Sequence, residues 1–243
     1  MTSKKDLIQE LNRGALANRV LYKDEGMIVI DKPSGIAVHI GAHAGIALEQ
    51  FFDQLKFNLP HNPWLAHRLD RETSGCLVLG RTKEALKRLG KQFADSKIEK
   101  TYWAVVVGCP EQEAGIINRA ILKTGKGARW RIILDDAGQE AVTEYSVLGK
   151  GDGFSWIEFK PHTGRTHQIR VHAAYALGCP LVGDPFYGHV ANSPSRRDVV
   201  LKEQRLMLHA RSISLPAKNA PIRITAPIPN AMYELLQRCG YRN

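Results

Sequence analysis

The chain has 243 residues, of which 44% are hydrophobic and 24% are charged. At about 150 residues per domain this length suits one globular domain with extensions, and the composition excludes a collagen-like, low-complexity or wholly disordered chain. Lysines and arginines outnumber aspartates and glutamates by 34 to 24, so the net charge of +10 favours a polyanionic partner. No apolar run approaches the roughly 18 residues of a spanning helix, and the N-terminus carries no apolar block, so we expect a cytoplasmic protein without a membrane segment.

The first predicted elements are a helix and a hairpin. Apolar residues at helical spacing follow Ser3, a candidate N-cap, and predict a short amphipathic helix. This helix belongs to an extension over residues 1–18 that precedes a single domain over residues 19–243. Two strand-like runs on either side of KDEG then predict a hairpin over residues 20–32, which KPSG ends.

Helical and strand-like periods alternate through the next part of the chain. Residues 46–57 have a helical period, the sequence CLVLG predicts a strand, and residues 82–96 predict a helix with Thr82 as its N-cap. Such a strand feeds directly into the helix that follows it.

The second half of the chain is rich in predicted strands. Turn sequences such as DDAG and KGDG separate these strands and favour antiparallel hairpins. The fold class is therefore α+β, with a large mixed and mainly antiparallel sheet. The predicted elements are strands within 98–161, a helix over 163–178, strands within 206–215 and 221–227, and a last helix over 230–239.

The sequence HRLDRETSG places Asp70 between Arg68 and Arg71 in a loop that enters a strand. Neighbouring guanidinium groups favour the ionised form of an aspartate, and an ionised carboxylate can act as a nucleophile. A surface aspartate that pairs with its neighbours or caps a turn is the competing interpretation. Composition alone leaves both open.

A second concentration of functional side chains is KPHTGRTHQIRVH, with Arg165 and Arg170 at a predicted strand-to-helix junction. Cations and backbone amides in such a place can hold phosphate oxygens. The three histidines of this segment are five residues apart and do not share one helical face, so a metal site is not expected. The four cysteines lie far apart without a C-x-x-C pair, which predicts reduced thiols.

The sequence KTGKGARWR places lysines and arginines around Trp130. Cations beside an aromatic ring are typical of surfaces that bind single-stranded nucleic acid. A solvated hairpin tip is the alternative interpretation of the same residues.

Taken in order, YKDEGMIVIDKPSG, HRLDRETSG, KTYWAVVVG, KPHTGRTHQIRVH and GDPFYG resemble the RluA-like family of RNA pseudouridine synthases. The resemblance runs from about residue 20 to about residue 227. It implies isomerisation of a uridine in RNA, in which the glycosidic bond breaks, the uracil rotates and carbon 5 rejoins the sugar. It also implies a reaction without cofactor or metal, and an α+β domain whose extended, mostly antiparallel sheet has flanking helices and carries a central catalytic cleft.

The resemblance assigns roles to four residues. Asp70 matches the essential aspartate, which would attack either the anomeric carbon of the ribose or carbon 6 of the base. Arg170 matches the arginine that pairs with that aspartate, and Tyr102 matches the tyrosine that stacks on the target base and can take its proton. Arg68 matches the residue that can occupy the gap left by the extruded nucleotide.

The expected partner is RNA, with a stem-loop of ribosomal or transfer RNA as substrate, and we expect a monomer. About 20 residues precede the hairpin, too few for the N-terminal alpha-L RNA-binding domain of many relatives. A non-catalytic RNA-binding protein would lack the set of aspartate, tyrosine and arginine found here. A metal-dependent nuclease would require clustered carboxylates with histidine, which the sequence does not offer.

Overall fold

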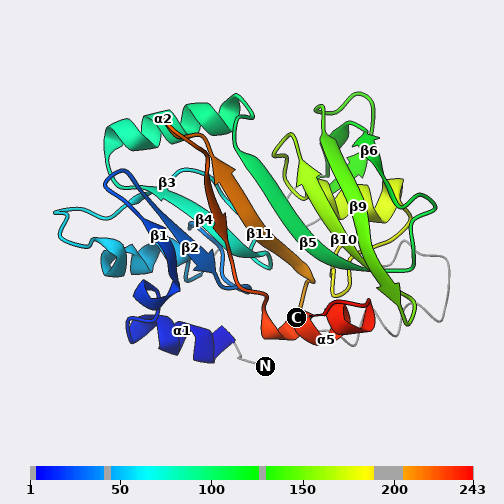
Figure 1. Ribbon diagram of the computed structural model, residues 1–243, viewed down its shortest axis with the longest axis horizontal. Coiled ribbons are helices and arrows are strands. Elements are labelled where there is room, and N and C mark those ends of the chain that lie inside the picture. Colours follow the sequence, from blue (N-terminus) through cyan, green and yellow to red (C-terminus); the bar gives the residue numbers. More distant parts are fainter. Residues whose placement is uncertain (1–3, 41–44, 126–129, 189–204, 243) are drawn as a thin grey trace. The chain divides into compact units, whose positions relative to one another are not determined.

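The protein forms two compact units, each assembled from segments that are distant in the sequence (Figure 1). A computed structural model describes residues 4–40, 45–125, 130–188 and 205–242. The first unit consists of Met1–Glu99 and Ala210–Pro227, and the second of Lys100–His209 and Ile228–Asn243.

The first unit begins its sheet with the predicted hairpin. Strands β1 (Val20–Lys23) and β2 (Met27–Lys32) pair in antiparallel fashion, which confirms the hairpin. Asp24 fixes the turn between them, because its Oδ1 accepts two backbone N–H groups at 2.7 and 2.8 Å. Strand β2 pairs in turn with β4 (Ser74–Gly80), whose residues are all buried.

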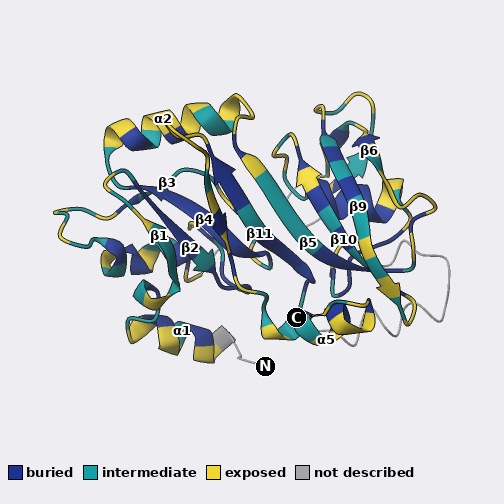
Figure 2. Cartoon of the chain, in the orientation of Figure 1, coloured by how far each residue is buried: buried dark blue, intermediate teal, exposed yellow. Residues whose placement is uncertain are grey.

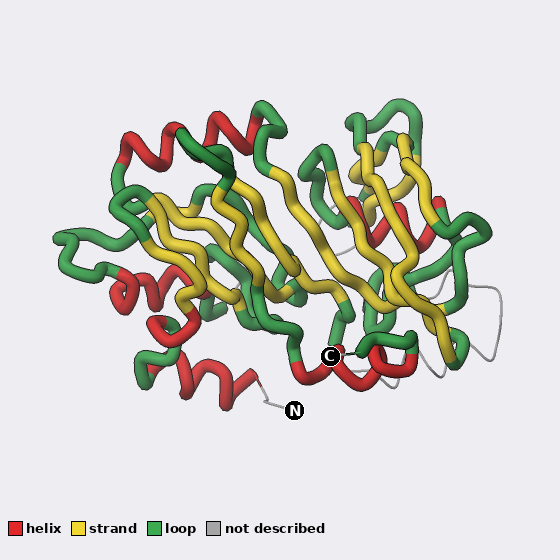
Figure 3. The backbone as a smooth tube through the Cα atoms, in the orientation of Figure 1, coloured by secondary structure: helices red, strands yellow, loops and turns green. Residues whose placement is uncertain are grey.

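The order of strands in the first unit is β1-β2-β4-β11, and two short strands pair at its sides. Figure 3 shows the strands of this unit with the helices around them. The remaining strands of this unit are β3 (Trp64–Leu65) on β4, β11 (Leu208–Leu215), and β12 (Ile222–Thr225) on β11.

The helices of the first unit follow the predicted patterns. Helix α2 (Lys83–Ala94) has Thr82 as its N-cap, whose Oγ1 accepts a hydrogen bond from the Ala85 backbone N at 3.1 Å. One face of this helix is buried and the opposite face is exposed to solvent (Figure 2). Helix α1 (Lys4–Asn12) is also confirmed, although its candidate cap at residue 3 lies outside the described residues. The helical period of residues 46–57 corresponds to a 3₁₀ helix, η2, over Leu48–Leu55.

The second unit is an antiparallel sheet with the strand order β5-β10-β9-β6. The KGDG turn between β9 and β10 uses left-handed backbone at Asp152 and Gly153, with φ of 52° and 79°. A separate hairpin of β7 and β8 includes Lys123, and Trp130 directly precedes β8, whereas residues 126–129 of the KTGKGARWR sequence lie outside the described residues. The strands are β5 (Glu99–Val107), β6 (Ala114–Asn118), β7 (Ile121–Thr124), β8 (Arg131–Leu134), β9 (Val142–Gly151) and β10 (Phe154–Pro161).

The helix predicted over 163–178 is wrong at its start. Helix α3 begins at Gln168 and runs to Val171, and a π-helical turn, η4 (His172–Ala176), follows it. Residues before α3 form a loop because the Gln168 side chain accepts hydrogen bonds from Thr163 Oγ1 and the Arg165 backbone N, at 2.7 and 3.0 Å. The predicted last helix is confirmed as α5 (Asn230–Arg238).

The four cysteines are free, and three of them are buried. Burial raises the pKa of the Cys76 thiol to about 12 and that of the Cys239 thiol to about 11. Such thiols stay protonated at neutral pH and act as small apolar side chains. Within the described ranges, no helix is long and apolar enough to cross a membrane.

Gly75 at the start of β4 provides a test of this packing. Its φ is +105°, and a Cβ there would lie 2.2 Å from the carbonyl O of Ala210 in β11. Because that atom belongs to the backbone of a neighbouring strand, Gly75→Ala is expected to lower the free energy of unfolding by about 2–4 kcal/mol. Urea denaturation measures the change.

The matched control is Gly90→Ala in α2, where no heavy atom lies within 4 Å of the added Cβ. That change is expected to leave stability unaltered or to raise it by about 1 kcal/mol, because alanine favours a helix. Equal stability of the two variants would contradict the backbone contact at Gly75.

Candidate active site

Asp70 lies in the loop between β3 and β4, and this loop is fastened to the turn that ends the first hairpin. The backbone N of Gly35 donates to the carbonyl O of Arg71 at 2.9 Å. The hydroxyl of Ser34 donates to the carbonyl O of Glu72 at 2.6 Å. The backbone immediately after Asp70 is therefore held by the predicted KPSG turn.

Lys32 strengthens the same connection from inside the protein. Its side chain is fully buried, and Nζ donates to the carbonyl O atoms of Pro33 at 2.7 Å and Arg71 at 3.1 Å. Burying an ammonium group costs free energy unless oxygen atoms replace its hydration shell. These two carbonyl groups supply such oxygen atoms and so connect Lys32 to the Asp70 loop. Lys32 and Ser34 were not identified from the sequence as residues of the site, because KPSG was given no role beyond ending the hairpin and contributing to the family motif.

The other end of the Asp70 loop is fixed by His67. Its Nε2 accepts a hydrogen bond from the Val78 backbone N at 3.0 Å, and its ring stacks on Phe93 of α2 at 4.5 Å between centroids. An Nε2 that accepts from a backbone N–H cannot carry a proton. Together with the KPSG contacts, this histidine holds the loop at both ends.

The residues around Asp70 itself alternate in exposure. Leu69 is buried, Asp70 is partly exposed, and Arg68 and Arg71 are exposed. The Asp70 carbonyl O accepts from the backbone N of Thr73, itself buried, at 3.2 Å. A buried residue before the carboxylate and a closed turn after it give Asp70 a defined position with access to solvent.

Arg170 lies in α3 of the second unit and forms a buried ion pair with Asp184. Two parallel hydrogen bonds of 2.8 Å connect its Nε and Nη2 to the two carboxylate oxygens. The side chains are only 3% and 0% exposed. Oδ1 of Asp184 also accepts the backbone N–H groups of Phe186 and Tyr187, at 2.8 and 3.1 Å. The predicted pairing of Arg170 with Asp70, a residue of the first unit, stays a prediction.

Tyr102 and Arg165 also belong to the second unit. Tyr102 is a partly buried residue of β5, opposite Phe159 of β10, and packs beside a core cluster that includes Ile169. Arg165 lies exposed in the loop before α3, and its Nε donates to the carbonyl O of Glu140 at 3.2 Å. Its guanidinium group is thus oriented by the backbone and accessible to solvent.

Two histidines of the same segment have structural partners. His172 is fully buried, with Nδ1 2.9 Å from Thr143 Oγ1 and Nε2 3.0 Å from the Arg119 carbonyl O. Burial lowers the pKa of His172, which keeps the ring neutral. His167 shares a hydrogen bond of 2.8 Å with the Tyr187 hydroxyl. In the part of the chain that the structure describes, no three His, Cys, Asp or Glu side chains gather to hold a metal ion.

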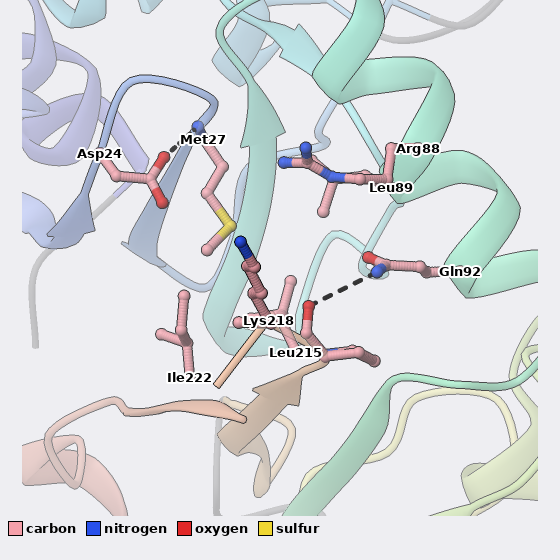
Figure 4. Close-up of a pocket in the computed structure, with 10 residues that line it drawn as sticks. Asp24, Met27, Arg88, Leu89, Gln92, Leu215, Lys218 and Ile222 are labelled. Atoms are coloured by element: carbon pink, nitrogen blue, oxygen red, sulfur yellow. Dashed lines mark hydrogen bonds between the residues drawn. The ribbon is translucent and has the colours of Figure 1, made fainter. Parts of the chain in front are cut away.

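A cavity of about 450 Å³ in the first unit contains none of the predicted site residues (Figure 4). Its carboxylate, Asp24, accepts hydrogen bonds within the β1–β2 hairpin, and the one from the Met27 backbone N is drawn in Figure 4. This cavity therefore offers no candidate nucleophile. Its lining comes from the first hairpin, α2, and the segment from β11 to β12: Asp24, Met27, Arg88, Leu89, Gln92, Leu215, Pro216, Ala217, Lys218 and Ile222.

Comparison with known proteins identifies the chain. Residues 26–175 match the family model described as RNA pseudouridylate synthase. The chain is 43% identical to an uncharacterized RNA pseudouridine synthase of Zymomonas mobilis, over 90% of this chain and 98% of that protein. It is 35% identical to ribosomal large subunit pseudouridine synthase D of Xanthomonas campestris, over 89% of this chain and 68% of that protein.

A solved structure agrees with these matches. Human RNA pseudouridylate synthase domain containing 4 superposes with a TM-score of 0.79 and 26% identity, over 98% of this chain and 99% of that one. The chain is thus an RNA pseudouridine synthase, an isomerase that acts on RNA. Within this class it belongs to the RluA-like family, as the ordered motifs predicted. The predicted α+β fold with a mostly antiparallel sheet is confirmed as well.

The Arg170–Asp184 pair yields a stability prediction. Asp184→Asn leaves a buried guanidinium group without a counter-charge, so the free energy of unfolding is expected to fall by about 3–5 kcal/mol in urea denaturation. The control is Glu234→Gln, which breaks the exposed pair between Glu234 and Arg238 in α5 and is expected to cost less than about 0.5 kcal/mol. A loss at Asp184 no larger than that of the control would contradict the role of the buried pair.

Proposed function

We propose that this synthase isomerises specific uridines in ribosomal or transfer RNA, with Asp70 as the nucleophile and the target nucleotide flipped out of its stack. The observation that carries the proposal is the loop of Asp70, which is fixed at both ends while Asp70 itself is partly exposed. A nucleophile has to be held close to the productive geometry, and a loop anchored on strands can do this.

The chemistry requires Asp70 in its ionised form. The carboxylate attacks either the anomeric carbon, with the uracil leaving, or carbon 6 of the base, with the glycosidic bond breaking afterwards. In both routes the uracil rotates, its carbon 5 bonds to the sugar, and the bond to Asp70 breaks so that the carboxylate is regenerated. The proton at carbon 5 is lost, and N1, which no longer bonds to the sugar, takes up a proton. The product is therefore an isomer of the substrate, and no oxidant or reductant is needed.

Three further residues complete the proposed site. Arg170 stabilises the charge of Asp70, Tyr102 stacks on the uracil and accepts its proton, and Arg68 fills the space that the flipped nucleotide leaves. The exposed position of Arg68 beside Asp70 and the partly buried ring of Tyr102 suit these roles.

RNA binding is proposed to rest on phosphate contacts and RNA shape. The net charge of +10 provides cations for phosphate contacts, of which exposed Arg165 is a candidate. The name of the Xanthomonas relative refers to the large ribosomal subunit, which supports ribosomal RNA as one substrate class. Transfer RNA is the other proposed substrate class, and the cytoplasm is the proposed location of the protein.

Asp70→Asn tests the nucleophile, because it preserves side-chain volume and removes the charge. Tritium release from unmodified cellular RNA labelled at uracil carbon 5 is expected to fall at least about 1,000-fold. Binding of the same RNA should stay within a few fold, since phosphate contacts are unchanged.

The control is Asp53→Asn, which removes one negative charge from an exposed position in η2 of the same unit. This variant is expected to release tritium at the wild-type rate. Full activity of Asp70→Asn would refute the proposed nucleophile.

Tyr102 is tested by two substitutions that separate its ring from its hydroxyl. Tyr102→Phe loses the hydroxyl group and keeps the stacking ring, whereas Tyr102→Ala loses both. The kcat/KM for tritium release is therefore expected to be about 10- to 100-fold lower in Tyr102→Ala than in Tyr102→Phe. Equal losses in the two variants would show that the hydroxyl group, rather than the ring, carries the role.

A further inference from the structure

Three aromatic side chains of the second unit contact one another beside Arg170. The ring centroid of Trp130 lies 5.1 Å from that of His167 and 6.0 Å from that of Phe186. His167 and Phe186 are 5.6 Å apart. The planes of Trp130 and Phe186 differ by only 26°, so the two rings are nearly parallel. We call Trp130, His167 and Phe186 the aromatic cluster.

The aromatic cluster leaves apolar surface open to solvent. Phe186 remains 51% exposed despite its contacts with the two other rings, and Trp130 is half-buried. Aromatic rings provide large flat surfaces that a second planar group can cover by stacking. A single exposed phenylalanine would need no explanation, but Phe186 belongs to a group of rings that come from three separate segments of the chain.

Positively charged groups accompany these rings. Lys123 Nζ lies 5.2 Å from the ring centroid of Trp130, and the guanidinium carbon of Arg170 lies 5.3 Å from that of Phe186. Proteins that bind single-stranded nucleic acid combine stacking rings with cations that contact phosphates. Arg170 is buried and paired with Asp184, so the cation that can contact a phosphate here is the exposed Lys123. The aromatic cluster with Lys123 therefore has both components of such a site.

His167 is held in an unusual conformation at this place. Its φ of +56° lies in the left-handed region, which costs a non-glycine residue of order 1 kcal/mol. The hydrogen bond to the buried Tyr187 hydroxyl, 2.8 Å, fixes the ring in that conformation. This strained backbone places the imidazole ring in contact with both Trp130 and Phe186.

We propose that the aromatic cluster stacks on an unpaired RNA base that flanks the target uridine. This inference rests on the proposed function, in which Arg170 acts at the target nucleotide, because Phe186 contacts Arg170 directly. Flipping a nucleotide removes a stacking partner from its neighbours, and a protein ring can replace that partner. Since every base has a π-face, such stacking helps affinity without selecting one base.

A purely structural role is the competing explanation. Trp130 packs against an apolar core cluster that includes Ile121 and Ile132, so its loss can weaken the fold. Phe186 is half-exposed and is a cleaner probe, because Phe186→Leu keeps an apolar side chain and removes only the ring.

The first measurement is tritium release at varied concentrations of unmodified cellular RNA. Trp130→Ala and Phe186→Leu are each expected to raise KM about tenfold, with kcat within about twofold, whereas Trp130→Phe should stay near the wild-type KM. The control is Trp64→Ala in β3 of the first unit, a tryptophan that also lies against a histidine, His61, at 4.3 Å, and this variant should leave KM unchanged. An unaltered KM in Phe186→Leu would overturn the proposal.

The second measurement does not require turnover. A short single-stranded oligouridylate should quench the tryptophan fluorescence of the wild type and of Trp64→Phe, and this quenching should be lost in Trp130→Phe. Quenching that persists in Trp130→Phe would also overturn the proposal.

The two measurements separate this proposal from the proposed reaction. Absence of tritium release in the wild type, together with quenching that depends on Trp130, would refute the reaction on these RNAs and support the stacking site.

Discussion

The buried ion pair of Arg170 and Asp184 determines how Arg170 and the aromatic rings around it are arranged in the second unit. A guanidinium group that is 3% exposed needs a full set of acceptors, and the Asp184 carboxylate supplies two of them. The same carboxylate accepts the backbone N–H groups of Phe186 and Tyr187, so it also shapes the GDPFYG turn. The two rings consequently lie 5.3 and 5.2 Å from the Arg170 guanidinium carbon. One carboxylate therefore fixes both the cation and the aromatic groups around it.

The Asp70 loop in the first unit is held in a different way. Its supports are hydrogen bonds to backbone carbonyls, from the buried Lys32 ammonium and the Ser34 hydroxyl, together with the acceptor nitrogen of His67. These contacts hold the backbone on both sides of Asp70. In the proposed function Asp70 acts as the nucleophile, and a loop anchored through its neighbours keeps that residue in place.

Local patterns predicted the elements that local interactions determine. The first hairpin, the helix capped by Thr82 and the helix predicted over 230–239 depend on spacing and turn residues, and all three predictions are confirmed. The predicted start of α3 is wrong. The Gln168 side chain accepts hydrogen bonds from the loop before the helix, and the helical period of the sequence does not reveal these contacts. Asp184 and Lys32 were missed for a similar reason: their importance comes from partners 14 and 39 positions away in the sequence. Only the order of motifs, through the family resemblance, pointed to the site residues as a set.

The free energies of nucleotide extrusion and of base stacking limit how the proposed site can act on RNA. Extruding a nucleotide costs a few kcal/mol, whereas one stacking contact contributes about 1–3 kcal/mol. In the proposed function, the aromatic cluster offsets part of that cost, and phosphate contacts from the excess of cations supply the remainder. Neither contribution distinguishes one base from another, because stacking uses the π-face and phosphates are common to all nucleotides. Selection of a particular uridine must then come from RNA shape, which decides whether a base can be splayed out with an unpaired neighbour beside it.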